Sequence, residues 1–365
     1  MKRLFIILFA LLAAPVFAQQ SVPDLPFISV PDFFKYPPEM NLGEMVSVAV
    51  NSKGHIFMLS HSNISGPAYN PIASQVLEFD QNGKFVREIG KGVYGFAYGH
   101  RVRFDKDDNL WVVDKGTDLI MRFNPIGHIT MVLGRRSEVP DEHEWMSLRM
   151  LATGKATRPP AVPGTFAQPT DIAWDRDGNM YITDGYINAR VAKYSKDGDW
   201  IKDWGSFGTA PGQFNTPHAI QIDRQGNLYV ADRGNARIQV FDTDGKFLRM
   251  IKIDVPVPPD ARLAFGVTPP TPPTTTSSAP GAPWDICITN GPTQYIYSID
   301  SFPGRVYKLS LDGKVLGVFG KTGRQLGQFI WGHGLACPSE NEVYVADNAN
   351  WRVQKLVADT AKKTR

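Results

Sequence analysis

Three histidines recur at one position of an internal repeat, but only in every second copy. They are His100 in Tyr-Gly-His-Arg-Val, His218 in Thr-Pro-His-Ala-Ile and His333 in Trp-Gly-His-Gly-Leu, separated by 118 and 115 residues. In a ring of six repeats, alternate copies stand about 120° apart, so these side chains would converge on the central axis. The pattern predicts a three-histidine site for a zinc-like ion, with one position left open for water or substrate.

The repeat itself predicts a ring of β-sheets. The phrase Asp-Arg-Asp-Gly-Asn-Met-Tyr-Ile-Thr-Asp over 175–184 is echoed over 223–232 and 105–114. Asn-Gly and Asp-Gly turns favour tight hairpins, and the flanking segments alternate apolar and polar residues as half-buried strands do. Four short strands in each copy of about 40 to 45 residues are typical of propeller blades. We therefore predict an all-β, six-bladed β-propeller without helices, its blades centred near 43–90, 95–134, 164–205, 212–251, 281–320 and 327–357.

The last blade has only about three strands before the chain ends. A strand from 26–34 could complete it, since an open sheet edge is a pairing hazard. Two insertions interrupt the propeller: 135–163, expected to form a lid or rim, and 252–282, a Pro/Thr-rich surface insertion expected to run extended. The predicted division is a signal peptide over 1–18, an N-terminal segment over 19–42, the propeller over 43–357 and a tail over 358–365.

Residues 1–18 have the features of a secretory signal peptide. Lys2 and Arg3 precede an apolar stretch, and a small-residue cleavage site ends at Ala18. The stretch is too short to cross a bilayer, so we expect no stable membrane insertion and a secreted or periplasmic protein. Without the leader, 37 basic residues face 36 acidic ones, a net charge of +1 with no basic stripe. This balance argues against a nucleic-acid partner.

The only two cysteines, Cys287 and Cys337, fall on the expected inner strands of blades five and six. In an oxidising compartment they could form a disulfide. They stand three and four residues after the positions equivalent to the histidines, however, and strict alternation would point them to opposite faces. A disulfide and two buried thiols both remain open at this point.

Two more side chains are expected on the same face of the ring as the histidines. In a propeller, the links between blades and the loops between second and third strands share one face. Tyr186 and Arg233 fall in such loops of blades three and four. A metal, a phenol and a guanidinium around one channel mouth would make a reaction centre. The alternatives are an ordinary rim tyrosine and an arginine that merely pairs with Asp232 or Asp184.

The propeller fold does not by itself require histidine at the repeated position. The other three repeats place Met45, Thr170 and Trp284 there. We expect three histidines that fall outside this pattern to be solvated: His55, His128 and His143.

The copies resemble NHL repeats, the family of six-bladed propellers, in phrases such as Gly-Gln-Phe-Asn-Thr-Pro-His218 and Ala-Asp-Arg233-Gly-Asn-Ala-Arg. Over 164–245, the runs Phe-Ala-Gln-Pro-Thr-Asp and Asp-Gly-Tyr186-Ile-Asn-Ala-Arg also resemble the peptidyl-α-hydroxyglycine α-amidating lyases. That resemblance implies a zinc ion on the three histidines, an active-site tyrosine at Tyr186 and a substrate-binding arginine at Arg233.

The chemistry that the resemblance implies is N-dealkylation of a carbinolamide to an amide and glyoxylate. Zinc would act as a Lewis acid on a substrate oxygen, Tyr186 would take the hydroxyl proton, and Arg233 would hold the substrate carboxylate. The sequence contains no copper monooxygenase domain, so a separate hydroxylating enzyme would have to make this substrate, or the lyase would act on another α-hydroxy amide.

The sequence departs from the family pattern in three places. His61 stands where the family has a second arginine, so the resemblance implies a substrate contact there without a permanent guanidinium. Gly334 replaces an aspartate that binds a structural Ca²⁺, which leaves only backbone carbonyls such as those of Met45 and Val102. Ala167 and Ile187 replace the two cysteines that flank the tyrosine motif.

Two other functions compete with a zinc lyase. One is a non-catalytic propeller that binds a peptide or glycan on its histidine face. The other is a lactonase-like hydrolase, although such enzymes favour calcium held by carboxylates and asparagine rather than by imidazoles. Metal identity and turnover would separate the three functions.

Overall fold

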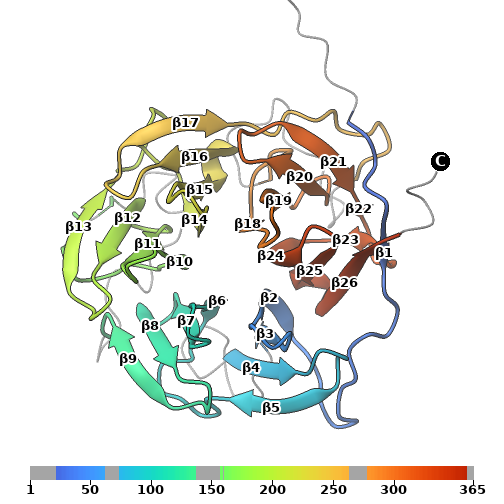
Figure 1. Cartoon of the computed structure of the whole chain (residues 1–365), viewed down its shortest axis with the longest axis horizontal. Coiled ribbons are helices and arrows are strands. Elements are labelled where there is room, and N and C mark those ends of the chain that lie inside the picture. The colour runs from blue at the N-terminus through green and yellow to red at the C-terminus, as the bar shows by residue number, and fades with distance from the viewer. Residues whose placement is uncertain (1–21, 62–73, 137–156, 159, 263–277, 360–365) are drawn as a thin grey trace, which may run out of the picture.

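The chain folds into a ring of six four-stranded antiparallel sheets (Figure 1). The computed structural model describes residues 22–61, 74–136, 157–158, 160–262 and 278–359. Five sheets run in sequence order from the axis outward. They are β2–β5 (Glu44–Val50, Ile56–His61, Ser74–Phe79, Phe85–Ile89), β6–β9 (Gly99–Phe104, Leu110–Asp114, Leu119–Phe123, Ile129–Leu133), β10–β13 (Asp171–Trp174, Met180–Asp184, Arg190–Tyr194, Trp200–Trp204), β14–β17 (Pro217–Ile222, Leu228–Asp232, Arg237–Phe241, Phe247–Ile251) and β18–β21 (Asp285–Ile288, Tyr295–Ile299, Val306–Ser310, Val315–Phe319).

The sixth blade joins both ends of the described chain. Its inner strands are β24 (Gly332–Ser339), β25 (Glu342–Asp347) and β26 (Arg352–Ala358), and its outer strand is β1 (Phe27–Ser29). Phe27 lies opposite Ala358 and Ser29 opposite Leu356 in an antiparallel pair. The strand expected from the N-terminal segment is thus present, and it covers the edge that β26 would otherwise leave open.

The repeated Asp-x-x-Gly-Asn phrase is a turn that one carboxylate organises. Asp175 accepts hydrogen bonds from the backbone N–H groups of Asp177 and Asn179, from the Asn179 amide and from the Tyr181 hydroxyl. Gly178 adopts φ 86°, a conformation that glycine adopts without strain. Asp223 makes the same set of contacts in the next blade. The phrase therefore recurs in blades two, three and four because the same aspartate-organised turn joins their first two strands.

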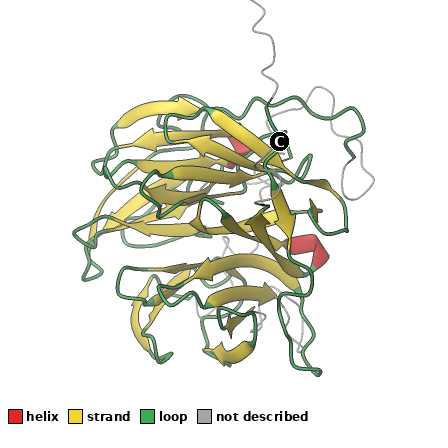
Figure 2. Ribbon diagram, turned by 45° about the vertical axis from the view of Figure 1, so that its right-hand side comes forward, coloured by secondary structure: helices red, strands yellow, loops and turns green. Residues whose placement is uncertain are grey.

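Apolar side chains pack between neighbouring sheets. No α-helix occurs in the described part of the chain (Figure 2). Only two single turns of 3-10 helix are found there, Arg233–Asn235 and Asn348–Asn350, each directly after the last residue of a second strand. Among the described residues no helix is long and apolar enough to cross a membrane. The predicted signal peptide over 1–18 lies outside the described residues, as do most of the insertion 135–163 and the centre of 252–282.

Candidate metal centre

Each of the three histidines is the extra residue of a β-bulge at the start of an inner strand. In β6 the register steps from Gly99 to Arg101, and β14 and β24 make the same step around His218 and His333. A bulge leaves one residue unpaired and re-aims its side chain. The three imidazoles therefore leave the plane of their sheets and point to the axis.

The backbone of the neighbouring blade fixes the tautomer of each imidazole. Nδ1 lies 2.6 Å from the carbonyl oxygen of Thr170 in His100, 2.6 Å from that of Trp284 in His218, and 2.7 Å from that of Val46 in His333. A carbonyl oxygen can only accept, so each Nδ1 carries the hydrogen and each Nε2 keeps its lone pair.

These contacts also correct one detail of the repeat alignment. Thr170, Trp284 and Val46 play equivalent parts, so Val46 rather than Met45 is the first-blade counterpart of the histidines. Val46 is the extra residue of the bulge in β2, as each histidine is in its own strand, and it stands five residues before Asn51 as His100 stands before Asp105.

The three Nε2 lone pairs face one another in a buried space. The potential ligand atoms lie within 4.8 Å of one another, and the Nε2 atoms of His100 and His218 are 3.0 Å apart. Burial lowers the pKa of all three imidazoles well below the ordinary value, with contributions from nearby positive groups such as Arg101. The imidazoles are thus held neutral, and neutral imidazole is the ligating form.

This donor set fits a metal ion. Converging lone pairs repel one another unless a cation lies between them. Metal-bound histidines commonly donate their other ring N–H to a backbone carbonyl oxygen, which orients the ring, and these three histidines do the same. His100, His218 and His333 can therefore hold a metal through three nitrogen atoms, which leaves other coordination positions to a substrate or water.

Tyr186 lies directly beside this histidine cluster. Its hydroxyl is 3.3 Å from Nε2 of His100 and 3.1 Å from Nε2 of His218. Burial would raise the pKa of the Tyr186 phenol, but the positive charges of Lys115 and Arg233 outweigh burial and lower the pKa below its ordinary value. The residue before Tyr186 packs closely against the next blade, because a Cβ at Gly185 would come within 1.9 Å of the carbonyl oxygen of Pro217.

Arg233 is buried with unused hydrogen-bond donors. Only 2% of the residue is exposed, and its Nε and Nη1 have no hydrogen-bond partner. Its guanidinium stacks on the ring of Trp284 at 4.0 Å. Asp232 pairs instead with Arg237 at 2.7 Å, and Asp184 pairs with Arg190 at 3.1 Å. The alternative in which Arg233 serves only to neutralise one of these aspartates is therefore wrong.

His61 comes near the cluster but not into it. Its Nε2 donates to the carbonyl oxygen of Gly99 at 2.8 Å, and its Nδ1 is 3.3 Å from Oε2 of Glu44. Both ring nitrogens are therefore engaged. A substrate contact by His61 stays a prediction, and it would require one of these two contacts to be exchanged.

Lys115 was not singled out from the sequence, yet its ammonium lies 4.2 Å from the centroid of the Tyr186 ring. The signal that would have found it is the residue after the aspartate that recurs near the end of the second strand in blades two to six. That position holds Arg233 after Asp232 and Lys115 after Asp114. The same reasoning that identified Arg233 therefore applies to Lys115.

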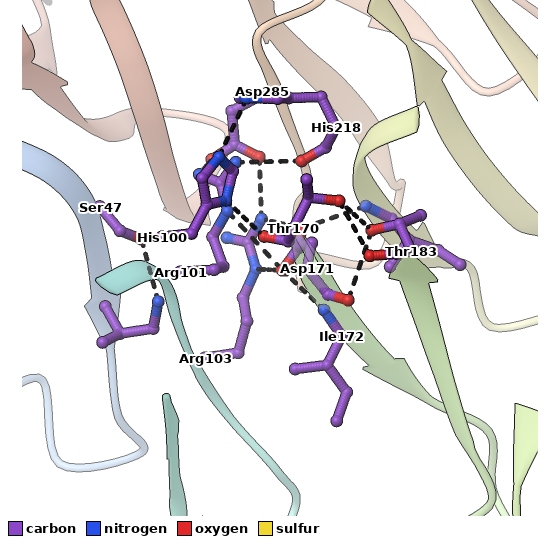
Figure 3. Close-up of polar contacts among 12 residues, drawn as sticks. Ser47, His100, Arg101, Arg103, Thr170, Asp171, Ile172, Thr183, His218 and Asp285 are labelled. Carbon is purple, nitrogen blue, oxygen red and sulfur yellow. Dashed lines mark hydrogen bonds and ion pairs between the residues drawn. The ribbon is translucent and has the colours of Figure 1, made fainter. Parts of the chain in front are cut away.

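One step further along the channel, two arginines and two aspartates form a buried charged cluster (Figure 3). Arg101 lies 2.7 Å from Asp285, and Arg103 lies 2.7 Å from Asp171 and 2.8 Å from Asp285. The carboxylates also accept backbone N–H groups of other inner strands, those of Ile220 and Leu335. This cluster ties the inner strands of blades two to six together around the axis.

The sequence is similar to a known repeat family and to known amidating enzymes. Residues 214–241 match the NHL repeat family. Peptidyl-glycine alpha-amidating monooxygenase A of Xenopus laevis is 31% identical over 298 residues, 78% of this chain and 27% of that protein. Peptidyl-alpha-hydroxyglycine alpha-amidating lyase 1 of Drosophila melanogaster is 27% identical over 286 residues, 75% of this chain and 47% of that protein. The match thus spans less than half the length of each relative.

The chain is an NHL-repeat propeller related to the amidating lyases. The structure of a streptogramin B lyase has the same fold, with a TM-score of 0.54 at 13% identity over 91% of this chain and 97% of that one. At that identity the likeness concerns the fold alone. The predicted six-bladed propeller of NHL repeats is confirmed.

The calcium site implied by the amidating-lyase resemblance does not fit this chain. A Cβ at Gly334 would lie 2.8 Å from Cα of Ser47 and 2.9 Å from the carbonyl oxygen of Val46, so the first-blade backbone occupies the space of the missing aspartate. The guanidinium of Arg101 donates to the carbonyl oxygen of the preceding residue, His333, at 3.3 Å. Where the relatives' cysteine pair would be, Ala167 and Ile187 pack together as buried apolar residues under Tyr186.

Cys287 and Cys337 form a disulfide between blades five and six, which settles the question that the sequence left open. Strict alternation pointed them apart, but Cys337 lies in a second bulge of β24, between Ala336 and Ser339, whereas β18 has a regular register. This second bulge re-aims the Cys337 side chain toward Cys287. Such a crosslink is consistent with an oxidising compartment.

The histidines outside the pattern have different surroundings. His128 is exposed as expected. His55 is only half-buried and its Nδ1 lies 2.7 Å from Glu78, so the expectation of a purely solvated side chain was wrong there. His143 lies outside the described residues.

Proposed function

We propose that this protein is an exported, zinc-dependent lyase of the amidating type, which cleaves an α-hydroxyglycine amide into an amide and glyoxylate. The observation that carries the proposal is the meeting of three neutral Nε2 atoms with the Tyr186 hydroxyl, 3.3 and 3.1 Å from two of them. Imidazole nitrogens favour zinc over calcium, which also argues against a lactonase of the calcium type.

The metal, held by His100, His218 and His333, would supply Lewis-acid polarisation of a substrate oxygen. Tyr186, as its phenolate, accepts the proton of the α-hydroxyl group as that oxygen forms a carbonyl bond to carbon and the carbon–nitrogen bond breaks. The same proton then passes from the Tyr186 phenol to the departing amide nitrogen, so that the phenolate is regenerated. No oxidant is required, because the α-carbon already carries its hydroxyl group.

Arg233 orients the substrate through its carboxylate. Its Nε–H and Nη1–H are buried donors without partners, and either can donate a charge-assisted hydrogen bond to a carboxylate oxygen. Stacking on Trp284 holds the guanidinium in place. The neutral amide part of the substrate would then lie toward the outer mouth of the channel.

The hydroxylated substrate would come from a separate hydroxylating enzyme in the same oxidising compartment, where a cleaved signal peptide would deliver the protein. Neither a nucleic acid nor a stably inserted membrane segment has a part in this proposal.

The test combines metal content with turnover. Elemental analysis of the purified protein should find about one zinc per chain, and the His218→Ala variant should lose it. Glyoxylate release from a hydroxyglycine peptide should depend on that zinc. The exposed His128→Ala variant is the matched control and should keep both properties. A folded protein that takes up no metal would contradict the lyase and leave a propeller that binds a peptide or glycan.

A further inference from the structure

Two cations lie beside the Tyr186 ring, and neither forms an ion pair with a carboxylate among the described residues. The ammonium of Lys115 is held only over aromatic faces, 4.2 Å from the Tyr186 centroid and 4.8 Å from the Tyr98 centroid. The guanidinium of Arg233 also lies near this ring, with Cζ 5.4 Å from the Tyr186 centroid. Lys115 comes from blade two and Arg233 from blade four, the two blades on either side of the one that carries Tyr186.

The two cations have separate supports. Arg233 stacks on Trp284 of blade five, whereas Lys115 stacks on Tyr98 beside blade two. Blades two and five stand opposite each other across the channel (Figure 1). Lys115 and Arg233 therefore provide two separate anchoring points beside Tyr186, rather than one fork for a single carboxylate.

No carboxylate of the described residues forms an ion pair with Lys115. Glu44 senses the charge of Lys115 but forms its hydrogen bonds with His61 and Tyr98. Aromatic faces offset part of the cost of a half-buried ammonium, but a carboxylate within hydrogen-bond distance would offset far more. An unpaired cation at the edge of a binding site indicates that its partner arrives with the ligand.

We propose that Lys115 forms a second anion subsite and that the preferred substrate is a dianion. This inference rests on the proposed function: Arg233 takes the carboxylate of the α-hydroxyglycine unit, and Lys115 takes an acidic group on the acyl part that is released as the amide. A peptide with an acidic residue just before the hydroxyglycine has this chemistry.

The test compares two nearly isosteric substrates, N-acetyl-Asp-α-hydroxyglycine and N-acetyl-Asn-α-hydroxyglycine. For the zinc-loaded wild type, kcat/KM for glyoxylate release should be roughly tenfold higher with the aspartyl substrate, as expected for one charge-assisted hydrogen bond. Lys115→Met should bring this ratio to about one, chiefly through KM, and Lys115→Arg should keep most of it. The control is Lys106→Met, an exposed lysine paired with Asp107, which should keep the wild-type ratio.

A wild-type ratio near one, or a ratio that persists in Lys115→Met, would overturn the second subsite while leaving the lyase intact. If neither substrate releases glyoxylate, the proposed function fails, and the subsite is judged by calorimetry with succinate and propionate. Tighter binding of succinate that disappears in Lys115→Met supports the subsite. Equal binding of the two acids overturns it.

Discussion

The central channel has two regions that differ in how far their buried polar groups are paired with one another. At the histidine end, three Nε2 lone pairs face one another and the donors of Arg233 lack partners. Further along, the carboxylates of Asp171 and Asp285 meet the guanidinium groups of Arg101 and Arg103. Only one peptide bond separates His100 from Arg101. Buried charges that satisfy one another hold the ring together, whereas unsatisfied donors and lone pairs mark the place where a ligand completes the structure.

The largest effect should come from breaking the paired region. Asp285→Ala would leave Arg101 and Arg103 buried without one of their carboxylates and would orphan the N–H of Leu335. We expect a loss of about 3–5 kcal/mol in the free energy of unfolding, measured by urea denaturation of the metal-free protein. His218→Ala, measured in the same way, should lose clearly less. Equal losses would mean that the two regions do not differ as proposed.

A somewhat smaller effect is expected from the disulfide that joins blades five and six. Replacing both Cys287 and Cys337 by alanine frees a loop with a sequence separation of 50 residues and should destabilise the protein by about 2–4 kcal/mol. Because the disulfide is not in the histidine cluster, zinc content should be unchanged in the folded variant. Loss of zinc from a folded variant would show that the crosslink positions the metal ligands as well.

Tyr186→Phe should separate chemistry from stability at the histidine end. Removing the hydroxyl should lower kcat for glyoxylate release by at least about a hundredfold, the usual contribution of a general base, which equals about 2.7 kcal/mol of barrier. Bound zinc should stay, and the free energy of unfolding should change by less than about 1 kcal/mol. A variant that keeps its turnover would exclude the phenol as the proton acceptor.

The sequence allowed the propeller and the histidine cluster to be predicted because both depend on periodicity. The Asp-x-x-Gly-Asn turn recurs for a local reason, and the alternation of histidine with other residues requires only that the ring has six members. The completing strand at Phe27–Ser29 followed from the need to cover an edge.

What could not be predicted depends on local departures from that periodicity. A second bulge in β24, between Ala336 and Ser339, contains Cys337 and breaks the strict alternation, so that Cys337 meets Cys287. The arginine–aspartate cluster joins Arg101 to Asp285, 184 residues away, and no spacing rule indicates which charges on different inner strands will meet. Lys115 was detectable, but only by comparing the residue after each blade's aspartate.

The pairing of β1 with β26 has a consequence for the order of folding. The Ser29 hydroxyl donates to the side-chain oxygen of Gln354, which lies 325 residues later in the sequence. The ring therefore closes by pairing a strand that is synthesised early with a strand that is synthesised late. Loop closure over such a separation comes late, and high contact order slows folding. Until residue 356 is available, blades one to five can form only an open arc. The three histidines, which the last blade must complete, then meet at the moment when the arc becomes a circle.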